Sequence, residues 1–565
     1  MNDIRRTILW VVFGFSLVLL WDQWQVHNGR KATFFPSAAP AATATGSAPP
    51  ASAAVPASSG ALPAASGSSG ALVPGGAAPA APAAAVARER IEVTTDVMKL
   101  VFDTEGGSVI KSEFLKYTEQ GQPDQPLVLM DDSANRVYQA QSGLIGGSFP
   151  NHKTPMVFSG DKQLADGANE LVVRFESAVS GGVKLVKTYT LKRGSYVIDV
   201  KHEVVNVGGA AVSPQVYVQL VRDGNAPEGE SSFYSTFTGP AFYTDAKKYQ
   251  KVEFKDIENN KADFVKSSPD GYVAMVQHYF ASAWIFGNET THENFARKVD
   301  TNLYSAGMIA PVGEVAPGAS KTFGARLFVG PQEEKMLESI TPGLELVKDY
   351  GWLTILSKPL YWLLDKLHGV IGNWGWAIVA LVVLLKIAFY WLNAKAYSSM
   401  AKMKAINPKI MEMRERLKDK PQQMQQEMMR IYREEKVNPM GGCLPIMIQI
   451  PVFIALYWVL LSSVEMRGAP WILWINDLSI KDPYFILPVI MTLSTLLQTA
   501  LNPQPPDPMQ AKMMWFMPLI FSVMFFFFPA GLVLYWITNN LLSIAQQWII
   551  NTRMGVPPQF NLPKF

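Results

Sequence analysis

The stretch WGWAIVALVVLLKIAFYWLN, residues 374–393, decides the fold of this chain. It is apolar almost without interruption, and as a helix it would be roughly 30 Å long, which matches the hydrocarbon core of a bilayer. We therefore predict a membrane-spanning helix over residues 374–396. Within the quoted stretch the only charged residue is Lys386, which lies roughly 15 Å beyond Trp376 and hence near the bilayer midplane.

A lysine at this depth needs compensation, because a charge near the centre of a bilayer costs about 2.5–3.5 kcal/mol on insertion scales. An acidic residue in a neighbouring helix would offset that cost. However, the other predicted spans contain no Asp or Glu; these are residues 443–464, 484–501, 515–528 and 531–550. Lys386 therefore has no counter-ion among the predicted spans.

Two explanations could account for Lys386 at this depth: its side chain snorkels to the membrane surface, or it faces a hydrated cavity inside a helix bundle. The residues on the same face of the helix distinguish them. Steps of three or four residues lead to Tyr390 and Asn393 in one direction and only to valines in the other. Because the polar stripe leaves the span at one end only, the pattern favours a water-filled cavity open at that end. Snorkelling among the lipid headgroups stays as the alternative.

The composition indicates an integral membrane protein with a large soluble part. The 565 residues are 48% hydrophobic, and the apolar residues are gathered into long runs. The single cysteine, Cys443, excludes an intramolecular disulfide framework. No group of His and Cys has the spacing of metal ligands, so we expect no metal and no cofactor.

The first half of the chain has three predicted parts. Residues 1–26 form an uncleaved signal anchor, because a short apolar run after two arginines ends in tryptophans rather than in a cleavage site. Residues 27–87 form a disordered tether rich in Ala, Pro, Ser and Gly. Residues 88–345 form one β-rich domain, where segments rich in Val, Tyr, Phe and Thr alternate with turns, as in an antiparallel sandwich.

Between the β-rich domain and the first core span, residues 350–370 mix apolar residues with charges and a proline. This pattern is typical of an amphipathic helix that lies in the membrane interface.

Residues 397–440 are predicted to form a cytoplasmic helical hairpin. Apolar residues recur every three or four positions in both halves, which is more typical of a seam between two helices than of a docking face; the seam includes Met403, Ile410, Met413, Met424 and Met428. The surrounding basic residues, among them Arg414, Arg416 and Lys418, are the expected contact to a ribosome or substrate, with Met424 and Met428 beside them.

The charge of the loops predicts the topology. The hairpin has ten Lys or Arg against six Asp or Glu, whereas loop 465–483 has three acids against two bases. Because an excess of basic residues marks the cytoplasmic side, we predict six spans with both termini in the cytoplasm and the β-rich domain outside. Loop 502–514 and the short tail 551–565 are then cytoplasmic.

Polar residues gather in the cytoplasmic halves of several predicted spans, while the outer halves are apolar. Together with Lys386, Tyr390 and Asn393 they predict a hydrophilic groove; the further groove residues are Gln449, Thr495, Gln498, Asn539 and Ser543, with Tyr535 and Trp536 at its apolar end. Any one Ser or Thr in a span is more often a helix-packing residue, so the argument depends on their shared depth.

The segment NPMGGCLPIMIQIPVF, residues 438–453, resembles the signature of the YidC/Oxa/Alb family of membrane protein insertases. GNWG at 372–375, DPM at 507–509 and FPAGLVLY at 528–535 match the same family. The resemblance covers residues 350–550, and the anchor, tether and β-rich domain are similar to the Gram-negative form of the family.

The resemblance implies a polytopic α-helical protein of the bacterial inner membrane, with a five-helix core and a periplasmic sandwich like that of galactose mutarotase. It implies no enzymatic activity and no direct recognition of nucleic acid, but a groove open to the cytoplasm that receives nascent membrane proteins, alone or beside the Sec translocon, with transient contact to the ribosome. This chain has Lys386 where many bacterial relatives have arginine, and Tyr535-Trp536 where relatives often have two tyrosines.

Two other functions stay open at this point. A small-solute transporter or channel would need a polar path to the outer face, which the apolar outer halves of the spans do not offer. A sugar-active enzyme would need an acid and a base that converge in the β-rich domain, where the four histidines stand in no such motif and are expected to be structural or surface residues.

Overall fold

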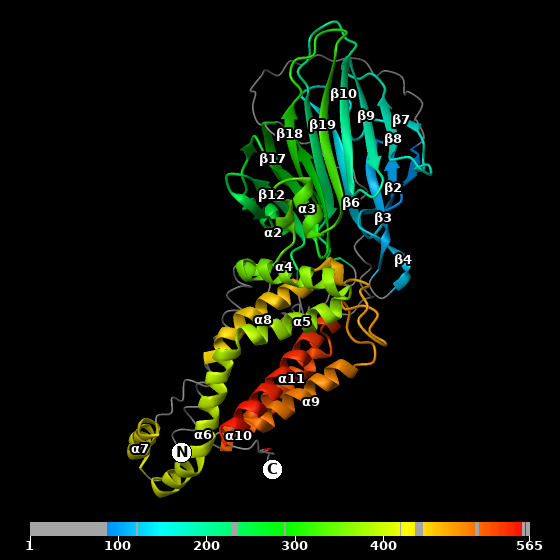
Figure 1. The fold of residues 1–565 in the computed structure, drawn as a ribbon. Helices are drawn as coiled ribbons and strands as arrows, with labels where there is room; N and C mark the ends of the chain where they lie inside the picture. Colours follow the sequence, from blue (N-terminus) through cyan, green and yellow to red (C-terminus); the bar gives the residue numbers. More distant parts are fainter. Residues whose placement is uncertain are drawn as a thin grey trace, which may run out of the picture. The chain divides into compact units, whose positions relative to one another are not determined.

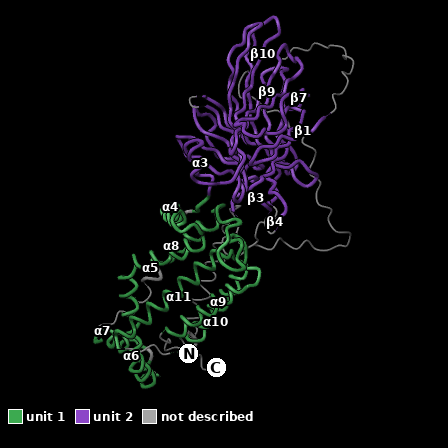
Figure 2. The backbone as a smooth tube through the Cα atoms, turned by 45° about the vertical axis from the view of Figure 1, so that its right-hand side comes forward, with its two compact units in different colours: residues 1–18, 349–565 green, residues 19–348 purple. Residues whose placement is uncertain are grey.

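The computed structural model describes residues 88–119, 122–227, 236–287, 290–418, 420–435, 444–502, 508–555 and 560. The predicted signal anchor and tether lie outside the described residues, as do parts of the loops around residues 436–443 and 503–507 and most of the tail. The described chain divides between Lys348 and Asp349 into two compact units, a β unit and a helical unit (Figures 1 and 2).

One sheet of the β unit has ten antiparallel strands in the order β1-β2-β3-β6-β11-β18-β17-β14, with β4 beside β3 and β5 beside β6. Its strands are β1 (Arg90–Thr94), β2 (Met98–Asp103), β3 (Ser108–Glu119), β4 (Gln122–Val128), β5 (Asp131–Asp132), β6 (Val137–Ile145), β11 (Gln215–Asp223), β14 (Ser267–Ser268), β17 (His292–Asp300) and β18 (Leu303–Pro311).

The other sheet has nine antiparallel strands in the order β13-β12-β15-β16-β19-β10-β9-β8-β7. Its strands are β7 (Met156–Gly160), β8 (Glu170–Ser177), β9 (Val183–Lys192), β10 (Val197–Asn206), β12 (Gly239–Thr244), β13 (Lys248–Lys251), β15 (Tyr272–Gln277), β16 (Phe280–Phe286) and β19 (Ser320–Pro331). The unit also contains α2 (Phe254–Glu258), α3 (Glu334–Ile340) and the short helix η1 (Leu344–Val347).

The core of the β unit lies between the two sheets. Tyr138 on β6 donates its hydroxyl to Met275 O on β15 at 3.2 Å, and Trp284 Nε1 on β16 donates to Gln219 O on β11 at 3.1 Å. In β8 exposed and buried residues alternate, because one face of the strand meets this core and the other meets solvent. The predicted all-β sandwich is therefore present.

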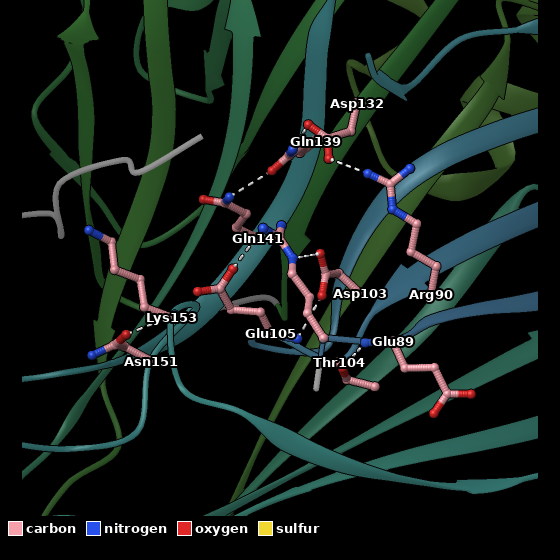
Figure 3. A network of polar contacts seen from close by, with 11 residues as sticks. Glu89, Arg90, Asp103, Thr104, Glu105, Asp132, Gln139, Gln141, Asn151 and Lys153 are labelled. Atoms are coloured by element: carbon pink, nitrogen blue, oxygen red, sulfur yellow. Dashed lines mark hydrogen bonds and ion pairs between the residues drawn. The ribbon is translucent and has the colours of Figure 1, made fainter. Parts of the chain in front are cut away.

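A polar network ties the first strands of the unit together (Figure 3). Asp132 on β5 accepts hydrogen bonds from Arg90 on β1 at 3.1 Å and from Gln139 on β6 at 2.9 Å. Gln141 in turn donates to Gln139 at 2.9 Å, and Gln219 on β11 donates to Gln141 at 2.8 Å. The three buried glutamines of this network are thus hydrogen-bonded in a chain, as is usual for buried polar groups.

Lys187 on β9 is buried completely and joins the two sheets. Its Nζ donates to Gly106 O at 2.6 Å and to Ser142 O at 2.7 Å, and both acceptors belong to the other sheet or its turns. Burial lowers the pKa of Lys187 to about 7. A neutral amine has two N–H groups, and the two carbonyls use both of them.

The buried histidine beside this lysine is structural. His202 Nε2 on β10 lies 2.8 Å from Ser142 Oγ. Burial, and to a smaller extent the charge of Lys187, lower the pKa of His202 to about 3, so its ring stays neutral at physiological pH.

We predict that the β unit becomes more stable as the pH rises from 7 to 9. The unfolded chain keeps the Lys187 proton up to the ordinary lysine pKa near 10.5, whereas the folded chain loses it near 7, so the unfolded state binds more protons throughout this window. One such proton raises the free energy of unfolding by about 1.4 kcal/mol per pH unit. Hydrogen exchange of the β9 amides in the full chain, measured over a series of urea concentrations at each pH, would give the unfolding midpoint. The change of this midpoint with pH gives the slope.

Lys187→Met should remove most of this pH dependence. The matched control is Lys184→Met on the same strand, because Lys184 is a partly exposed lysine paired with Glu176. An unchanged slope in Lys187→Met, or a slope lost in Lys184→Met, would show that another group controls the pH dependence.

The helical unit contains eight longer helices and two short ones among its described residues. They are η2 (Gly351–Leu353), α4 (Thr354–Ile371), α5 (Trp374–Ala388), α6 (Tyr390–Arg416), α7 (Pro421–Glu434), α8 (Leu444–Ser462), η4 (Val464–Met466), α9 (Ile486–Leu501), α10 (Pro508–Phe525) and α11 (Ala530–Arg553). α11 is the central helix, which packs against α5, α6, α8 and α9, while α10 packs on α9 and α4 lies across α5 and α8 (Figure 1).

Within the described residues, no single helix is both long enough and apolar enough to cross a bilayer by itself; α5 and α6 meet that requirement as a pair, with a bend of 69° between them. The count of six spans therefore stays a prediction.

The bend differs from the predicted straight span. We expected one span over residues 374–396 and a hairpin that begins at residue 397, whereas the helix breaks at Phe389 and α6 continues from there to Arg416. Residues 387–391 contain neither proline nor glycine, which are usual at sharp kinks, so the sequence holds no local signal for the break. The break places Lys386 in the last turn of α5.

α6 and α7 form the predicted hairpin, and the four methionines predicted for its seam, Met403, Met413, Met424 and Met428, lie there. Ile406, Ile410 and Met413 are buried there, and Met424 and Met428 of α7 pack against them. An ion pair of 2.6 Å between Lys409 and Glu435 joins the two arms. The spacing that predicted a seam is thus matched by the packing.

Residues 463–485, here named the cap loop, connect α8 to α9 and hold the start of α11. The backbone N–H of Ala530 donates to Ile480 O at 2.7 Å, and that of Gly531 donates to Leu478 O at 2.9 Å. Asp482 is 1% exposed and accepts three hydrogen bonds, from Trp474 Nε1 at 3.0 Å and from the N–H groups of residues 484 and 487 at 3.0 and 2.7 Å. The loop is therefore a folded part of the bundle.

Candidate substrate groove

Lys386 projects from the end of α5 toward α11. Its Nζ donates to Ser543 Oγ at 2.7 Å, and Ser543 Oγ donates to Asn539 O at 2.7 Å. Within the described residues Lys386 makes no ion pair. Lys386 lies in the last turn of α5, directly before the bend into α6. A hydroxyl without net charge thus takes the place of a carboxylate.

A cavity of about 40 Å³ lies against the lysine. It is large enough for about three water molecules. The polar groups of the lining are those of Lys386, Asn393, Gln449, Tyr535 and Asn539. The lysine therefore faces a space that water can occupy, as the hydrated-cavity explanation requires.

Part of the cavity lining comes from α8 and α11, which a hydrogen bond joins. Gln449 Nε2 donates to Asn539 Oδ1 at 2.8 Å. Beyond this pair the wall becomes aromatic, because Phe453 stacks on Tyr535 at 5.9 Å and meets the edge of Trp536 at 4.5 Å. Polar and apolar contacts thus follow one another along the same two helices.

Two further polar residues of α11, Asn540 and Gln547, lie outside the cavity lining and bond to α9 and the residue that follows it. Asn540 Nδ2 donates to Ser494 Oγ at 3.1 Å and to Thr495 Oγ1 at 2.9 Å. Gln547 Nε2 donates to Asn502 Oδ1 at 3.2 Å. These contacts are hydrogen bonds between packed helices rather than a cavity lining.

The structure therefore divides the predicted groove residues. It brings Lys386, Asn393, Gln449, Tyr535, Asn539 and Ser543 together, with Trp536 in the adjoining aromatic wall. Thr495 belongs to the α9–α11 contact, Gln498 is half-buried on α9, and Tyr390 is 46% exposed.

Sequence reasoning missed the apolar part of the lining, which is formed by Val382, Leu385, Phe389, Leu392 and Val452. In the sequence Leu385 directly precedes Lys386, Phe389 follows it by three positions, and Leu392 follows it by six. No sequence signal separates these residues from lipid-facing ones, because both kinds are large and apolar.

The hairpin has a basic surface apart from its seam. Arg414 is half-buried, whereas Arg416 and Lys418 are exposed, and in the described part of the chain none of the three makes an ion pair. Met424 and Met428 face the seam, while Met411 and Met429, which the sequence did not single out, are 53% and 47% exposed. The free cations and these two methionines are available to a partner.

Two family models match consecutive parts of the chain. One is described as YidC periplasmic domain and matches residues 90–363; the other is described as 60Kd inner membrane protein and matches residues 366–556. Proteins named membrane protein insertase YidC from Cupriavidus necator, Ralstonia nicotianae and Burkholderia cenocepacia are 57%, 56% and 55% identical to the chain. Each match covers 98% of this chain and 98%, 98% and 99% of the relative. The chain belongs to the YidC family.

Solved structures include two more likenesses. A YidC insertase with its first transmembrane domain resolved is 20% identical, over 81% of this chain and 91% of that one, with a TM-score of 0.37. A galactose mutarotase related enzyme from Lactobacillus acidophilus is 8% identical, over 43% of this chain and 97% of that one, with a TM-score of 0.28. Both TM-scores are too low to carry an argument, and the assignment to the YidC family depends on the sequence matches.

Proposed function

We propose that this chain inserts nascent membrane proteins into the inner membrane of a Gram-negative bacterium and acts there as a chaperone. The relatives of the YidC family are named for this activity. The observation that supports it in this chain is Lys386, a lysine between membrane helices that is hydrogen-bonded to Ser543, makes no ion pair among the described residues and faces a cavity of about 40 Å³.

The proposed mechanism is physical. A polar or acidic flank of the substrate enters the groove from the cytoplasm, where Lys386, Asn393, Gln449 and Asn539 replace bulk water, so the flank has only part of the bilayer left to cross. The apolar part of the substrate moves along the aromatic wall into lipid, and hydrophobic burial supplies the driving force. A single positive charge without a fixed carboxylate attracts the flank weakly enough to release it.

The topology and the partners are parts of the same proposal. We expect six spans, cytoplasmic N- and C-termini, and a periplasmic β unit whose sandwich resembles galactose mutarotase. The groove works alone or with the Sec translocon, and the hairpin meets the ribosome transiently. The exposed apolar side chains of α9 and α10, such as Leu493 at 61% and Ile520 at 65%, support a lipid environment for these helices.

The transporter alternative has less support. It requires a polar path from the cavity to the outer face, and the segment between them holds the aromatic contacts of Phe453 with Tyr535 and Trp536. Reconstitution would separate the two functions: purified protein in liposomes should insert a small coat-type membrane protein. Passage of a solute without insertion would support a transporter instead.

We predict that charge reversal on the hairpin weakens insertion without unfolding the protein. Arg414→Glu, Arg416→Glu and Lys418→Glu together change the local charge by six units on a surface where these cations make no ion pair among the described residues. Their attraction to ribosomal RNA or to an acidic substrate flank then becomes repulsion. Crosslinking to ribosome–nascent chain complexes should fall about tenfold at low salt, because contacts of this kind are strongly salt-dependent.

The matched control reverses Lys409, which is already paired with Glu435 inside the hairpin. Lys409→Glu should affect the fold of the hairpin more than its crosslinking. Unchanged crosslinking and insertion in the triple variant would place the contact elsewhere.

A further inference from the structure

The cap loop turns several large apolar side chains outward. Leu473 is 76% exposed and Tyr484 is 67% exposed, and their neighbours Ile472 and Phe485 are 43% and 38% exposed. We name these four residues the apolar ridge. The two pairs lie on neighbouring turns, since the rings of Trp474 and Tyr484 are 6.5 Å apart, and exposed apolar groups gathered in this way indicate an interaction surface.

The exposure of the apolar ridge does not come from a loosely packed loop. The N–H of Trp471 donates to Ile475 O at 2.9 Å, and the N–H of Leu478 donates to Ala469 O at 3.0 Å. Ile475 and Leu478 are each 1% exposed and belong to the core of the helical unit. The loop thus buries some of its apolar residues and presents others.

Two residues of the ridge have a left-handed backbone conformation. Leu473 has φ of 53° and Phe485 has φ of 57°. Residues other than glycine rarely adopt this conformation, and it persists only where the surrounding structure enforces it. Here the buried carboxylate of Asp482 fixes the second turn, because it accepts from the N–H groups on both sides of Phe485. The fold therefore holds both side chains in outward-facing positions.

The ridge continues the outer face of α9. The exposed residues of this helix follow directly after Phe485 and recur along one side; they are Ile486, Val489, Ile490, Leu493 and Leu497. The opposite side, with Leu487, Met491 and Ser494, is buried. Tyr484 and Phe485 thus continue the exposed apolar face of α9, and Ile472 and Leu473 stand on the neighbouring turn, whose Trp474 ring lies 6.5 Å from that of Tyr484.

We propose that the apolar ridge of the cap loop enters the outer leaflet of the bilayer at the boundary between headgroups and acyl chains. This inference depends on the membrane-spanning role proposed for α9. The length of that helix favours lipid as the partner: its 16 residues extend about 24 Å, less than the roughly 30 Å of a hydrocarbon core. The ridge at its N-terminal end supplies the missing apolar length, and tyrosine is a residue that favours this boundary.

Site-specific fluorescence on the full chain in liposomes tests this proposal. In a Cys443→Ser background, which removes the only cysteine, the variants Leu473→Cys and Ile472→Cys would carry an environment-sensitive NBD dye. Ile472 provides a second position with ordinary backbone geometry, in case the left-handed site does not tolerate the change. Asn476→Cys, exposed on the same loop but outside the ridge, is the matched control.

The dye at 472 or 473 should be quenched about twofold more by phosphatidylcholine with a nitroxide near the headgroup than the dye at 476, and less by aqueous iodide. Iodide quenching at 472 and 473 as strong as at 476 would overturn the proposal. Protection from both quenchers would also overturn it, because it would mean that protein covers the ridge.

A further variant separates this inference from the proposed function. Leu493→Cys on α9 should be quenched by a nitroxide deep in the acyl chains. Lipid quenching of the dye at 493 but not at 472 or 473 would refute only the proposal that the ridge enters the bilayer. Absence of lipid quenching at 493 would contradict the membrane-spanning role proposed for α9.

Discussion

Lys386→Glu is expected to reduce the insertion of substrates with acidic flanks by at least about tenfold. At about 8 Å and an effective dielectric constant near 20, one pair of charges interacts by about 2 kcal/mol, and the substitution turns this attraction into repulsion. The carboxylate would also lose the hydrogen bond that the Lys386 ammonium donates to Ser543.

The other substitutions at this position give a graded series. Lys386→Arg should retain activity, because the mechanism requires a positive charge and not a particular geometry. Lys386→Ala should impair mainly the substrates with acidic flanks. If the side chain only snorkels, Lys386→Leu would be harmless or stabilising, since it removes a charge without an acidic partner from the membrane.

Lys395 on the next helix, α6, provides a matched control. Lys395 is exposed on α6 and lies over the ring of Trp391 at 3.8 Å, outside the cavity. Lys395→Glu should leave insertion nearly unchanged when measured in the same liposomes with the same substrates. An equal loss in both variants would indicate a general effect of surface charge.

Asp482→Ala is expected to lower the stability of the helical unit by about 2 kcal/mol or more, because it leaves one buried N–H group and two partly buried ones without their acceptor. One of these groups is the N–H of Leu487 in the first turn of α9, so the start of that helix loses its cap. The midpoint of thermal unfolding in detergent, followed by tryptophan fluorescence, measures this loss.

Asp477→Ala is the control for this change in the same loop. Asp477 is half-buried and accepts from the N–H and the hydroxyl of Ser479 only. Its loss should cost about 1 kcal/mol. Equal midpoints for the two variants would mean that the cap loop does not support α9.

The partner of Lys386 shows where sequence reasoning ends. The absence of acidic residues in the predicted spans indicated an unusual environment for Lys386, but nothing in the sequence identified Ser543 as its partner or the last turn of α5 as its position. Both follow from the break at Phe389, which neither proline nor glycine marks.

The polar residues of the spans illustrate a related limit. Hydropathy predicts how deep a residue lies but not which neighbour it faces. Asn539 and Asn540 are adjacent in the chain, yet one bonds to Gln449 beside the cavity and the other to Thr495 on α9. The direction of each side chain depends on how α11 packs, which only the fold provides.

The β unit was easier to predict in kind than in detail. Alternation of buried and exposed residues indicates a sandwich, as β8 illustrates. The strand order does not follow from alternation, because β19 pairs with β10 and β16 across long stretches of sequence. The burial of Lys187 was not predicted, although alternation places it on the same face of β9 as Val183, Leu185 and Tyr189.

Labelling of a cysteine at position 386 tests the central claim, a hydrated groove around Lys386, most directly. In the Cys443→Ser background, Lys386→Cys should react rapidly with a membrane-impermeant maleimide added from the side of the hairpin, and not with one added from the side of the β unit. Failure to label from either side, together with full activity of Lys386→Leu on a substrate with an acidic flank, would contradict the hydrated groove.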